Sequence, residues 1–344
     1  MISILIVNWN TRELLRSCLK SLQSLTIREV GQRVNQQAVG VEAVGVVDSS
    51  SEEFGVPANL DKGKEFGVSN DDEIRVIEHE IVVVDCASSD GSAAMVAHEF
   101  PDVKLIASDE NLGFAAGNNR AYEAAVGEWI WLLNPDTEIL DNAAESLLER
   151  LQSQSEIGAV ASALVDARDG HIQRSCRTFP TPAALWAQAS GLAALFPRSK
   201  RFGFYKMGWW NYRDARPVEQ PMASSLMLRR VAIEEAGGLF DEQFPIFFND
   251  VDLCWRLWQS GWQIWFEPRS RVKHWGGAAT SQVRPEMIAR SHQSLRKFYA
   301  KHYRGKIAAP LYFATMAMSE LAGRARILAT KKRKKKQKEG QSSP

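Results

Sequence analysis

The first half of the chain alternates short apolar runs with helical patterns. Residues 2–7 form a continuous β-rich apolar run, and residues 14–22 repeat leucine and cysteine at helical spacing behind Thr11, a suitable N-cap. The alternation resumes after residue 80, and such alternation is typical of a mostly parallel central sheet flanked by helices, an α/β fold. The further predicted strands are 81–84, 103–106, 129–133 and 160–165, and the further predicted helices are 92–100, 115–126 and 142–152.

The second half has a mixed pattern. Residues 176–217 are rich in aromatic residues, proline and arginine and show no clean periodicity, so we interpret them as a ligand-binding loop. After them the pattern predicts strands at 224–228, 262–266 and 271–274, and helices at 231–236, 251–259, 290–303 and 311–328.

Charge divides the chain into segments. Between Glu42 and Glu80 there are eleven acidic residues and three basic ones, with scattered glycine and serine, which predicts an irregular acidic insertion over residues 28–80. The predicted organisation is therefore a catalytic domain made of 1–27 and 81–275, the insertion 28–80, C-terminal helices over 276–330 and a basic disordered tail over 331–344.

The tail accounts for the near-zero net charge of +1. It holds seven lysine or arginine residues and one glutamate, which leaves 35 basic and 40 acidic residues in the rest of the chain. That mildly acidic body argues against a nucleic-acid binder. The helix 311–328 followed by the basic run 331–336 is typical of peripheral contact with an anionic membrane surface; a packed helix with a solvated tail fits equally well.

The cysteines and the apolar segments indicate the cellular compartment of the protein. Four cysteines stand far apart without a CxxC pair, which favours a reduced, cytoplasmic chain. The apolar N-terminus lacks a basic flank and a cleavage site, so it predicts a strand rather than a signal peptide. No run reaches about 18 apolar residues, the length of a membrane span. These features predict a cytoplasmic protein, with the inner face of the membrane as its place of action if the basic tail binds there.

Polar side chains follow three of the predicted strands. The first strand ends at Asn8 and Asn10, the second at Asp85, and the strand 129–133 at Asn134 and Asp136. Ligands of open α/β sheets bind outside the carboxyl ends of the strands. The sequence therefore predicts one site to which these ends contribute.

Asp136 and His274 are candidate metal ligands. Pro135 holds Asp136 in a turn, and a hard divalent cation combines one or two carboxylates with substrate phosphates. His274 ends a predicted strand, and neutral imidazole is a common ligand. A plain Pro-Asp turn and a structural histidine are the alternatives.

Asp85 and a glycine-asparagine segment are candidates for donor binding. A carboxylate at a strand end can accept a hydrogen bond from a nucleobase or a ribose, whereas the nearby Asp90 and Ser92 are interpreted as turn and cap residues. Asn111, Gly113 and Asn118 join a strand to an alanine-rich helix whose first amides could receive phosphate, although ordinary turns use the same residues. The segment runs from Asn111 to Asn119.

A last cluster lies at a helix start. Asp250 is a candidate general base for an acceptor hydroxyl, and Asn249, Asp252 and Arg256 are candidate acceptor contacts. An N-cap with a favourable first-turn charge explains the same acidic residues without any chemistry.

The ordered set of motifs resembles the family 2 glycosyltransferases of GT-A fold, in their rhamnosyltransferase-like branch, over about residues 1–27 and 81–300. Each piece alone is weak, but their order is specific. The matching pieces are Val7-Asn-Trp-Asn10, Val84-Asp85 to Ser92, Asn111 to Asn119, Leu133-Asn-Pro-Asp136, Met227 to Arg230, Gly237 to Asp241, Phe248 to Leu253 and His274.

The resemblance implies an inverting transfer of a sugar from a nucleotide-diphosphate donor to a glycan or lipid-linked acceptor. By it Asp85 contacts the nucleobase, Asp136 is the remaining acid of the DxD element that holds a divalent metal (Mg or Mn), and Asp250 is the base. The branch suggests rhamnose as the sugar. This chain departs from the family by having Asn249 where a glutamate is usual and by its longer insertion.

Three other classes of protein were considered. A non-catalytic nucleotide-sugar binding module would keep Asp85 and Asp136 but would not need Asp250. A processive polysaccharide synthase would carry a Gln-x-x-Arg-Trp element and several membrane spans, which are absent from the sequence. A dinucleotide-binding dehydrogenase needs a GxGxxG turn after the first strand, where this chain has Asn-Trp-Asn-Thr.

Overall fold

The structure, a computed structural model of the 344-residue chain, describes every residue except 24, 26, 31–73, 141, 277–283 and 342–344. Its contacts divide the chain into two units, one made of residues 1–27 and 77–344 and the other of residues 28–76. Strands β2 (Ile27–Val30) and β3 (Ile74–Ile77) pair with each other at the ends of the insertion. The irregular character predicted for the insertion lies outside the described residues over 31–73.

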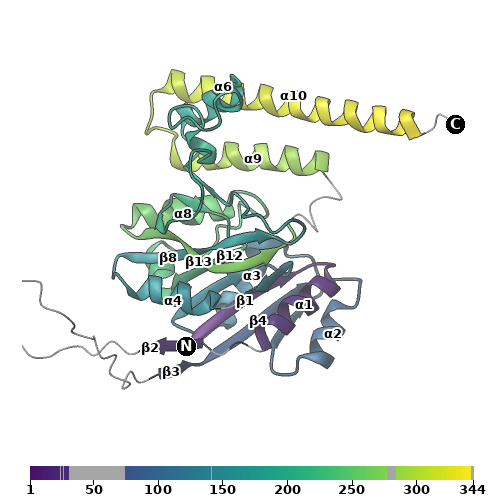
Figure 1. The fold of residues 1–344 in the computed structure, drawn as a ribbon. Helices are drawn as coiled ribbons and strands as arrows, with labels where there is room; N and C mark the ends of the chain where they lie inside the picture. Colours follow the sequence, from purple (N-terminus) through teal and green to yellow (C-terminus); the bar gives the residue numbers. More distant parts are fainter. Residues whose placement is uncertain (24, 26, 31–73, 141, 277–283, 342–344) are drawn as a thin grey trace, which may run out of the picture. The chain divides into compact units, whose positions relative to one another are not determined.

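A single large sheet forms the centre of the first unit (Figure 1). Its strand order is β10-β13-β8-β12-β6-β1-β4-β5, with β7 paired to β13. The strands are β1 (Ile2–Asn8), β4 (His79–Cys86), β5 (Lys104–Ser108), β6 (Trp129–Leu133), β7 (Thr137–Ile139), β8 (Ile157–Asp166), β10 (Arg216–Pro217), β12 (Ser225–Arg229) and β13 (Gln263–His274).

Most strands of this sheet run in one direction. β5, β4, β1 and β6 are mutually parallel, and β12 is antiparallel to both β6 and β8. β8 therefore runs with β6, and β13 pairs parallel to β8. The predicted α/β fold with a mostly parallel sheet flanked by helices is confirmed.

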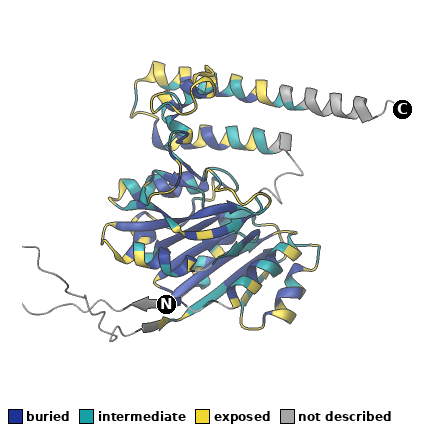
Figure 2. Cartoon of the chain, in the orientation of Figure 1, coloured by how far each residue is buried: buried dark blue, intermediate teal, exposed yellow. Residues whose placement is uncertain are grey.

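Helices cover both faces of the sheet. Along β1 the alternating side chains separate, so that Ile4 and Ile6 join the core beneath α1, α2 and α4 while Leu5 joins the opposite core beneath α3, α7 and α8. Figure 2 shows the resulting buried sheet between the layers. The helices are α1 (Arg12–Gln23), α2 (Ser92–Glu99), α3 (Gly113–Ala124), α4 (Ala143–Gln152), α7 (Arg230–Glu235) and α8 (Asn249–Gln259).

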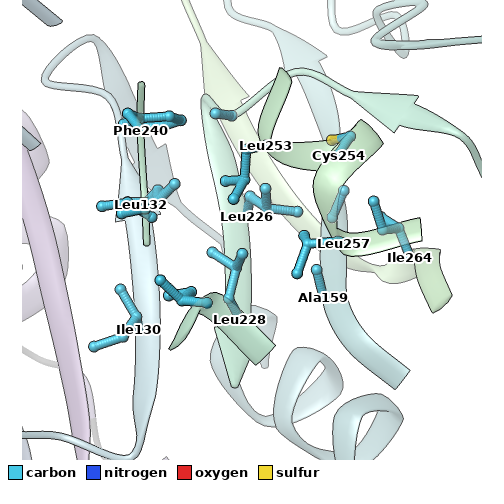
Figure 3. Packing of buried hydrophobic residues seen from close by; sticks show 14 of the residues in the cluster. Ile130, Leu132, Ala159, Leu226, Leu228, Phe240, Leu253, Cys254, Leu257 and Ile264 are labelled. Atoms are coloured by element: carbon cyan, nitrogen blue, oxygen red, sulfur yellow. The ribbon is translucent and has the colours of Figure 1, made fainter. Parts of the chain in front are cut away.

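The packing of α8 fixes one wall of the site. Figure 3 shows Leu253 and Leu257 of α8 facing Leu226 and Leu228 of β12, and all four side chains are fully buried. Each such leucine stabilises the fold by about 1.5–3 kcal/mol relative to exposure. The start of α8 is thereby held against the sheet.

A third cluster of buried residues joins α8 to the C-terminal helices. Phe244, Phe298 and Tyr299 form its centre. Trp186 Nε1 of α5 donates a hydrogen bond to Thr315 Oγ1 of α10 at 3.1 Å, which joins the outer helices. The remaining elements are β9 (Cys176–Arg177), α5 (Pro182–Ala189), α6 (Leu192–Leu195), η1 (Phe204–Lys206), β11 (Gln220–Pro221), α9 (Arg284–His302) and α10 (Ala309–Gln341), with β9 and β11 paired.

The elements differ from the predictions in a few places. The two strands predicted over 262–274 are one strand, β13, whose register against β8 shifts between Glu267 and Arg271. The residues over 176–217 without periodicity contain α5, α6 and η1. Helix α10 continues to Gln341, where a disordered tail was predicted from residue 331. Among the helices of the described chain, none combines the length and the apolar composition needed to cross a bilayer.

Candidate active site

The carboxyl ends of three neighbouring parallel strands meet at one edge of the sheet. β1 lies between β4 and β6, with Asn8 opposite Asp85 and Leu5 opposite Leu132. The Asn134–Asp136 turn follows β6 directly. The strand order thus brings the predicted residues of these three ends to one edge, as the position of ligand sites in α/β sheets requires.

Asn8 and Asp85 form a buried pair. Asn8 Nδ2 donates to Asp85 Oδ1 at 2.8 Å, and the Ser88 amide donates to Asp85 Oδ2 at 3.0 Å. Asn8 is 0% and Asp85 2% exposed. Asn8 therefore orients the Asp85 carboxylate rather than offering a free amide to a ligand.

The neighbouring loop is tied to the turn after β4. Asn10 takes a left-handed conformation (φ 51°), and its Oδ1 accepts from the Ser89 amide at 2.8 Å. Asp90 Oδ2 accepts from the Arg12 amide at the start of α1, and Asp90 Oδ1 accepts from the Ser92 amide. The interpretation of Asp90 as a turn and cap residue is confirmed.

The start of α3 is already occupied by protein groups. Gly113 N donates to Asn111 Oδ1 at 2.9 Å, and the amides of Phe114 and Ala115 both donate to the Pro245 carbonyl. Asn118 Nδ2 bonds within the helix to the Phe114 carbonyl. The amides predicted to receive phosphate are thus used to dock the loop before α8, which corrects the prediction for Asn111, Gly113 and Asn118.

Asp136 and His274 face each other at the end of β6 and β13. His274 Nε2 lies 3.5 Å from Asp136 Oδ1, and both side chains are nearly buried, 5% and 10% exposed. His274 Nδ1 lies 2.7 Å from Gln173 Oε1, an oxygen that can only accept, so Nδ1 carries the proton. In the neutral ring Nε2 then presents a lone pair toward the carboxylate.

These two groups fit a divalent cation. Two acceptors that face each other without a shared proton suit a positive ion between them. Metal-binding histidines are usually oriented by a hydrogen bond at their other ring nitrogen, and Gln173 supplies that bond for His274. Asn134 Oδ1 is buried and has no hydrogen-bond partner among the described residues. No cluster of three or more His, Cys, Asp or Glu residues suited to a metal occurs in the described chain, so phosphate oxygens would complete the ligand set.

Asp250 stands at the start of α8, close to the end of β6. Its carboxylate accepts from the amides of Val251 and Ala223, and Ser224 Oγ accepts from Asn134 Nδ2 at 3.1 Å. Ala223 and Ser224 are consecutive residues of one segment. They therefore link the predicted base, Asp250, to the predicted donor-binding residue Asn134. Desolvation by the surrounding protein raises the pKa of Asp250, although its side chain stays partly exposed.

The chain is similar to known glycosyltransferases. The family model described as Glycosyl transferase family 2 matches residues 72–213. An N-acetylglucosaminyl-diphospho-decaprenol L-rhamnosyltransferase of Mycobacterium tuberculosis (strain ATCC 25618 / H37Rv) is 28% identical over 275 residues, 76% of this chain and 88% of that protein. Both matches support a family 2 glycosyltransferase.

Other similar proteins include the O-antigen biosynthesis protein RfbC of Myxococcus xanthus, 27% identical to this glycosyltransferase over 213 residues, 59% of this chain and 15% of that protein. Among solved structures, the mannosyltransferase PcManGT from Pyrobaculum calidifontis in complex with GDP-Man and Mn2+ is 16% identical, with a TM-score of 0.49 over 96% of this chain and 74% of that chain.

Asp252 and Arg256 do not line the glycosyltransferase site. Asp252 is 0% exposed and accepts hydrogen bonds from Arg256, Lys301 and His302, which join α8 to α9. Arg256 also donates to the carbonyls of Ala236, Gly238 and Leu239. Both side chains hold the fold around Asp250, which corrects their prediction as acceptor contacts.

Asn249 also has a local role. It is 3% exposed, its Oδ1 accepts from the Asp250 amide at 2.7 Å, and its Nδ2 donates to the Ile246 carbonyl at 3.3 Å. These bonds shape the first turn of α8. Asn249 therefore positions Asp250, in place of the predicted contact with the acceptor.

Sequence reasoning missed Gln173, Ser88 and Ser224. Gln173 lies 101 residues before the histidine that it orients, so no local sequence pattern could predict this pair. Ser88 and Ser224 stand in segments that the sequence did identify, beside Asp85 and at the start of a predicted strand. Their hydroxyl groups could have been weighed as neighbours of the predicted site.

Proposed function

We propose that this glycosyltransferase moves a sugar from a nucleoside-diphosphate donor to a hydroxyl of a glycan or lipid-linked acceptor by a single displacement with inversion, assisted by Mg²⁺ or Mn²⁺. The observation that carries the proposal is the shared contact of Asp250 and Asn134 with the Ala223–Ser224 segment. It supports a base and a donor site close enough to act on one sugar.

Asp250 removes the proton from the acceptor hydroxyl. As that oxygen forms its bond to the anomeric carbon, the bond from this carbon to the phosphate oxygen breaks and its electron pair leaves with the nucleoside diphosphate. A carboxylate whose pKa is raised by desolvation is a better proton acceptor than an ordinary surface aspartate. Asn249 holds the Asp250 backbone amide during this step.

Asp136 and His274 would hold the metal, with Gln173 fixing the orientation of the imidazole. A divalent cation at this position would supply positive charge against the negative charge of the departing diphosphate. Asp85, oriented by Asn8, is the proposed partner of the nucleobase. Asn10 and Asn134 are the remaining proposed donor contacts.

The relative's name supports a rhamnosyl donor and an acceptor that carries an N-acetylglucosaminyl diphosphate on a polyprenol. A non-catalytic nucleotide-sugar binding module is the alternative, and the raised pKa of Asp250, which suits a general base, argues against it.

An apolar surface supports action at a membrane face. Phe313, Leu321 and Leu328 are exposed on α10 at a spacing of eight and seven residues, which places them on one helix face. Leu195 and Phe196 of the neighbouring α6 region are also exposed. A peripheral contact of this surface, together with the basic run 331–336, would bring the site to a lipid-linked acceptor. Sedimentation with anionic vesicles should fall when residues 331–344 are removed, and unchanged sedimentation would oppose this contact.

A donor screen tests the proposed chemistry. Release of nucleoside diphosphate is measured for a panel of nucleotide sugars with and without chelator, and the anomeric configuration of the product is determined by NMR. We expect turnover that the chelator abolishes, a product of inverted configuration, and weakened donor binding in Asp136→Ala. A product that retains the donor's configuration would exclude the single displacement.

A further inference from the structure

Three cationic side chains from distant parts of the chain lie around the Tyr205–Lys206 segment, and one of them, Arg177, also acts on Asp250. Arg177 ends β9, Lys206 ends η1, and Arg326 lies on α10. None of them belongs to the proposed donor site at Asp136 and His274. We refer to Arg177, Lys206 and Arg326 as the cationic cluster.

The backbone ties two members of the cationic cluster to one another. Arg177 pairs with Gln220 across β9 and β11, and the amide of the following residue, Thr178, donates to the Tyr205 carbonyl at 3.0 Å. Gln220 Nε2 donates to the Thr178 carbonyl at 2.6 Å. Arg177 and the Tyr205–Lys206 segment are therefore held together by a short network.

Helix α10 brings in the third member. Thr315 of α10 bonds to Trp186, and Ser319 Oγ lies 3.5 Å from His292 Nδ1 of α9. A Cβ added at Gly323 would lie 2.9 Å from the His292 ring, so α10 packs closely on α9 one turn before Arg326. The close packing holds this part of α10 in a definite position.

The charges of the cluster act on the same neighbours. Burial lowers the pKa of Lys206, and the positive charges of Arg177 and Arg326 lower it further. Burial raises the pKa of Tyr205, which also senses Arg177, Asp250 and Arg326. Arg177, Arg326 and the proposed base therefore all act on one tyrosine, which is the residue next to Lys206.

In the described part of the chain no anionic group forms an ion pair with the cationic cluster, although Asp250 interacts with Arg177 electrostatically. None of its three side chains makes a hydrogen bond or an ion pair with a described residue, whereas Arg256 nearby makes four hydrogen bonds. Like charges that share a space repel each other, and Arg177 is in addition half-buried. A bound anion would relieve this repulsion and supply acceptors to the guanidinium groups.

We propose that Arg177, Lys206 and Arg326 form a subsite for the phosphate groups of the acceptor, beside the base that its hydroxyl must reach. The proposal rests on the proposed function and specifies its substrate: the acceptor carries a phosphate or diphosphate group. The donor's phosphates are assigned to the metal site at Asp136 and His274, whereas Arg177 acts electrostatically on Asp250.

Binding of inorganic pyrophosphate tests the subsite without any sugar transfer. Isothermal titration is carried out on the full chain in the presence of chelator, so that the metal site does not contribute. We expect binding that weakens about tenfold in Arg177→Gln and to a smaller extent in Lys206→Gln and Arg326→Gln, as loss of a charge-assisted hydrogen bond implies. Arg324→Gln is the matched control, because it lies two residues from Arg326 on a nearly opposite face of α10.

Steady-state kinetics then distinguish acceptor from donor. Arg177→Gln should raise the KM of a diphosphate-bearing acceptor about tenfold, while the Kd of the donor and the KM of an acceptor without phosphate stay within twofold of the wild type. A raised donor Kd with an unchanged acceptor KM would assign the cluster to the donor and overturn the proposal. Equal pyrophosphate binding by the wild type and all three variants would also overturn it.

The two proposals fail in different ways. A chain that binds pyrophosphate through the cluster but transfers no sugar keeps the anion subsite and loses the proposed function. A chain that transfers sugar with no effect of the three substitutions keeps the function and loses the subsite. If Arg177→Gln does not fold, as judged by its thermal melt, the exposed Lys206 and Arg326 variants carry the test.

Discussion

Asp252→Asn is expected to destabilise the fold strongly, although it removes only one charge. The Asp252 carboxylate is fully buried and receives Arg256 Nε at 2.8 Å, Lys301 Nζ at 3.0 Å and His302 Nε2 at 2.6 Å. An amide oxygen cannot satisfy all three donors, and the amide nitrogen would meet them as a further donor. The substitution therefore leaves buried positive groups without a counter-charge.

The magnitude follows from the electrostatics of the carboxylate. Burial disfavours the ionised form, but the hydrogen bonds from His302, Lys301 and Arg256 outweigh it and lower the pKa of Asp252 from 3.8 to about 2. This difference corresponds to about 2 kcal/mol of stability at neutral pH. Breaking a buried pair by removing one partner costs about 3–5 kcal/mol. Since Arg256 keeps its backbone carbonyl partners, we expect the free energy of unfolding to fall by about 3 kcal/mol.

The assay is urea unfolding of the two proteins at pH 7, repeated between pH 5 and pH 2. Because the folded pKa of Asp252 is lower than the unfolded one, its stabilisation is present above the unfolded value and is lost as pH falls from 3.8 toward about 2. The difference in the free energy of unfolding between the wild type and Asp252→Asn should therefore become smaller over that pH range. A difference in the free energy of unfolding below about 1 kcal/mol at pH 7, or a difference that does not change with pH, would refute the reasoning.

Asp250→Asn is the matched control, with the same substitution two residues earlier in α8. Burial raises the pKa of Asp250, so its ionised form lowers the stability of the folded state at neutral pH, and the neutral amide removes that cost. We expect unchanged or slightly higher stability together with lost transfer. A destabilisation equal to that of Asp252→Asn would show that any change at the start of α8 disturbs the fold.

Three further outcomes are expected. Gln173→Ala should raise the metal concentration for half-maximal activity about 10–100-fold with little change in kcat at saturating metal, because His274 loses its orienting bond; an unchanged metal titration would contradict the metal assignment. Gly117→Ala should lower the stability by about 1–3 kcal/mol in a urea titration, because its Cβ would lie 2.8 Å from Val7 Cγ1; unchanged stability would contradict the close approach of α3 to β1. In a pH–rate profile, activity should fall as pH drops through the raised pKa of Asp250, and a limb at the ordinary aspartate value would exclude Asp250 as the base.

The strands in the first half of the chain could be predicted from the sequence because most of them are short, continuously apolar runs. The strand predicted at 129–133 agrees with β6, and the predicted helix 92–100 agrees with α2 within one residue. β13 was predicted as two strands because a proline and charged residues interrupt its apolar pattern, and the structure accommodates them in a register shift. Local patterns cannot report such a tertiary accommodation.

The site was partly readable for a similar reason. Strand ends identified Asn8, Asp85 and Asp136, because the topology of an α/β sheet brings such ends together. What a polar residue bonds to was not readable. Asp250 and Asp252 look alike in the sequence, yet one is a partly exposed carboxylate with a raised pKa and the other is a buried carboxylate that accepts hydrogen bonds from three side chains. The donor groups of Lys301 and His302 lie about 50 residues away in the sequence, so only the fold separates the two roles.

The rate of sugar transfer by Asp250→Asn, measured at saturating donor, acceptor and metal, tests the central claim most directly. If Asp250 accepts the proton of the attacking hydroxyl, kcat should fall by about 10²–10⁴-fold while the Kd of the donor stays within twofold of the wild type. Transfer within about threefold of the wild-type rate would contradict the assignment of Asp250 as the base, because a general base typically contributes about 10²–10⁴-fold.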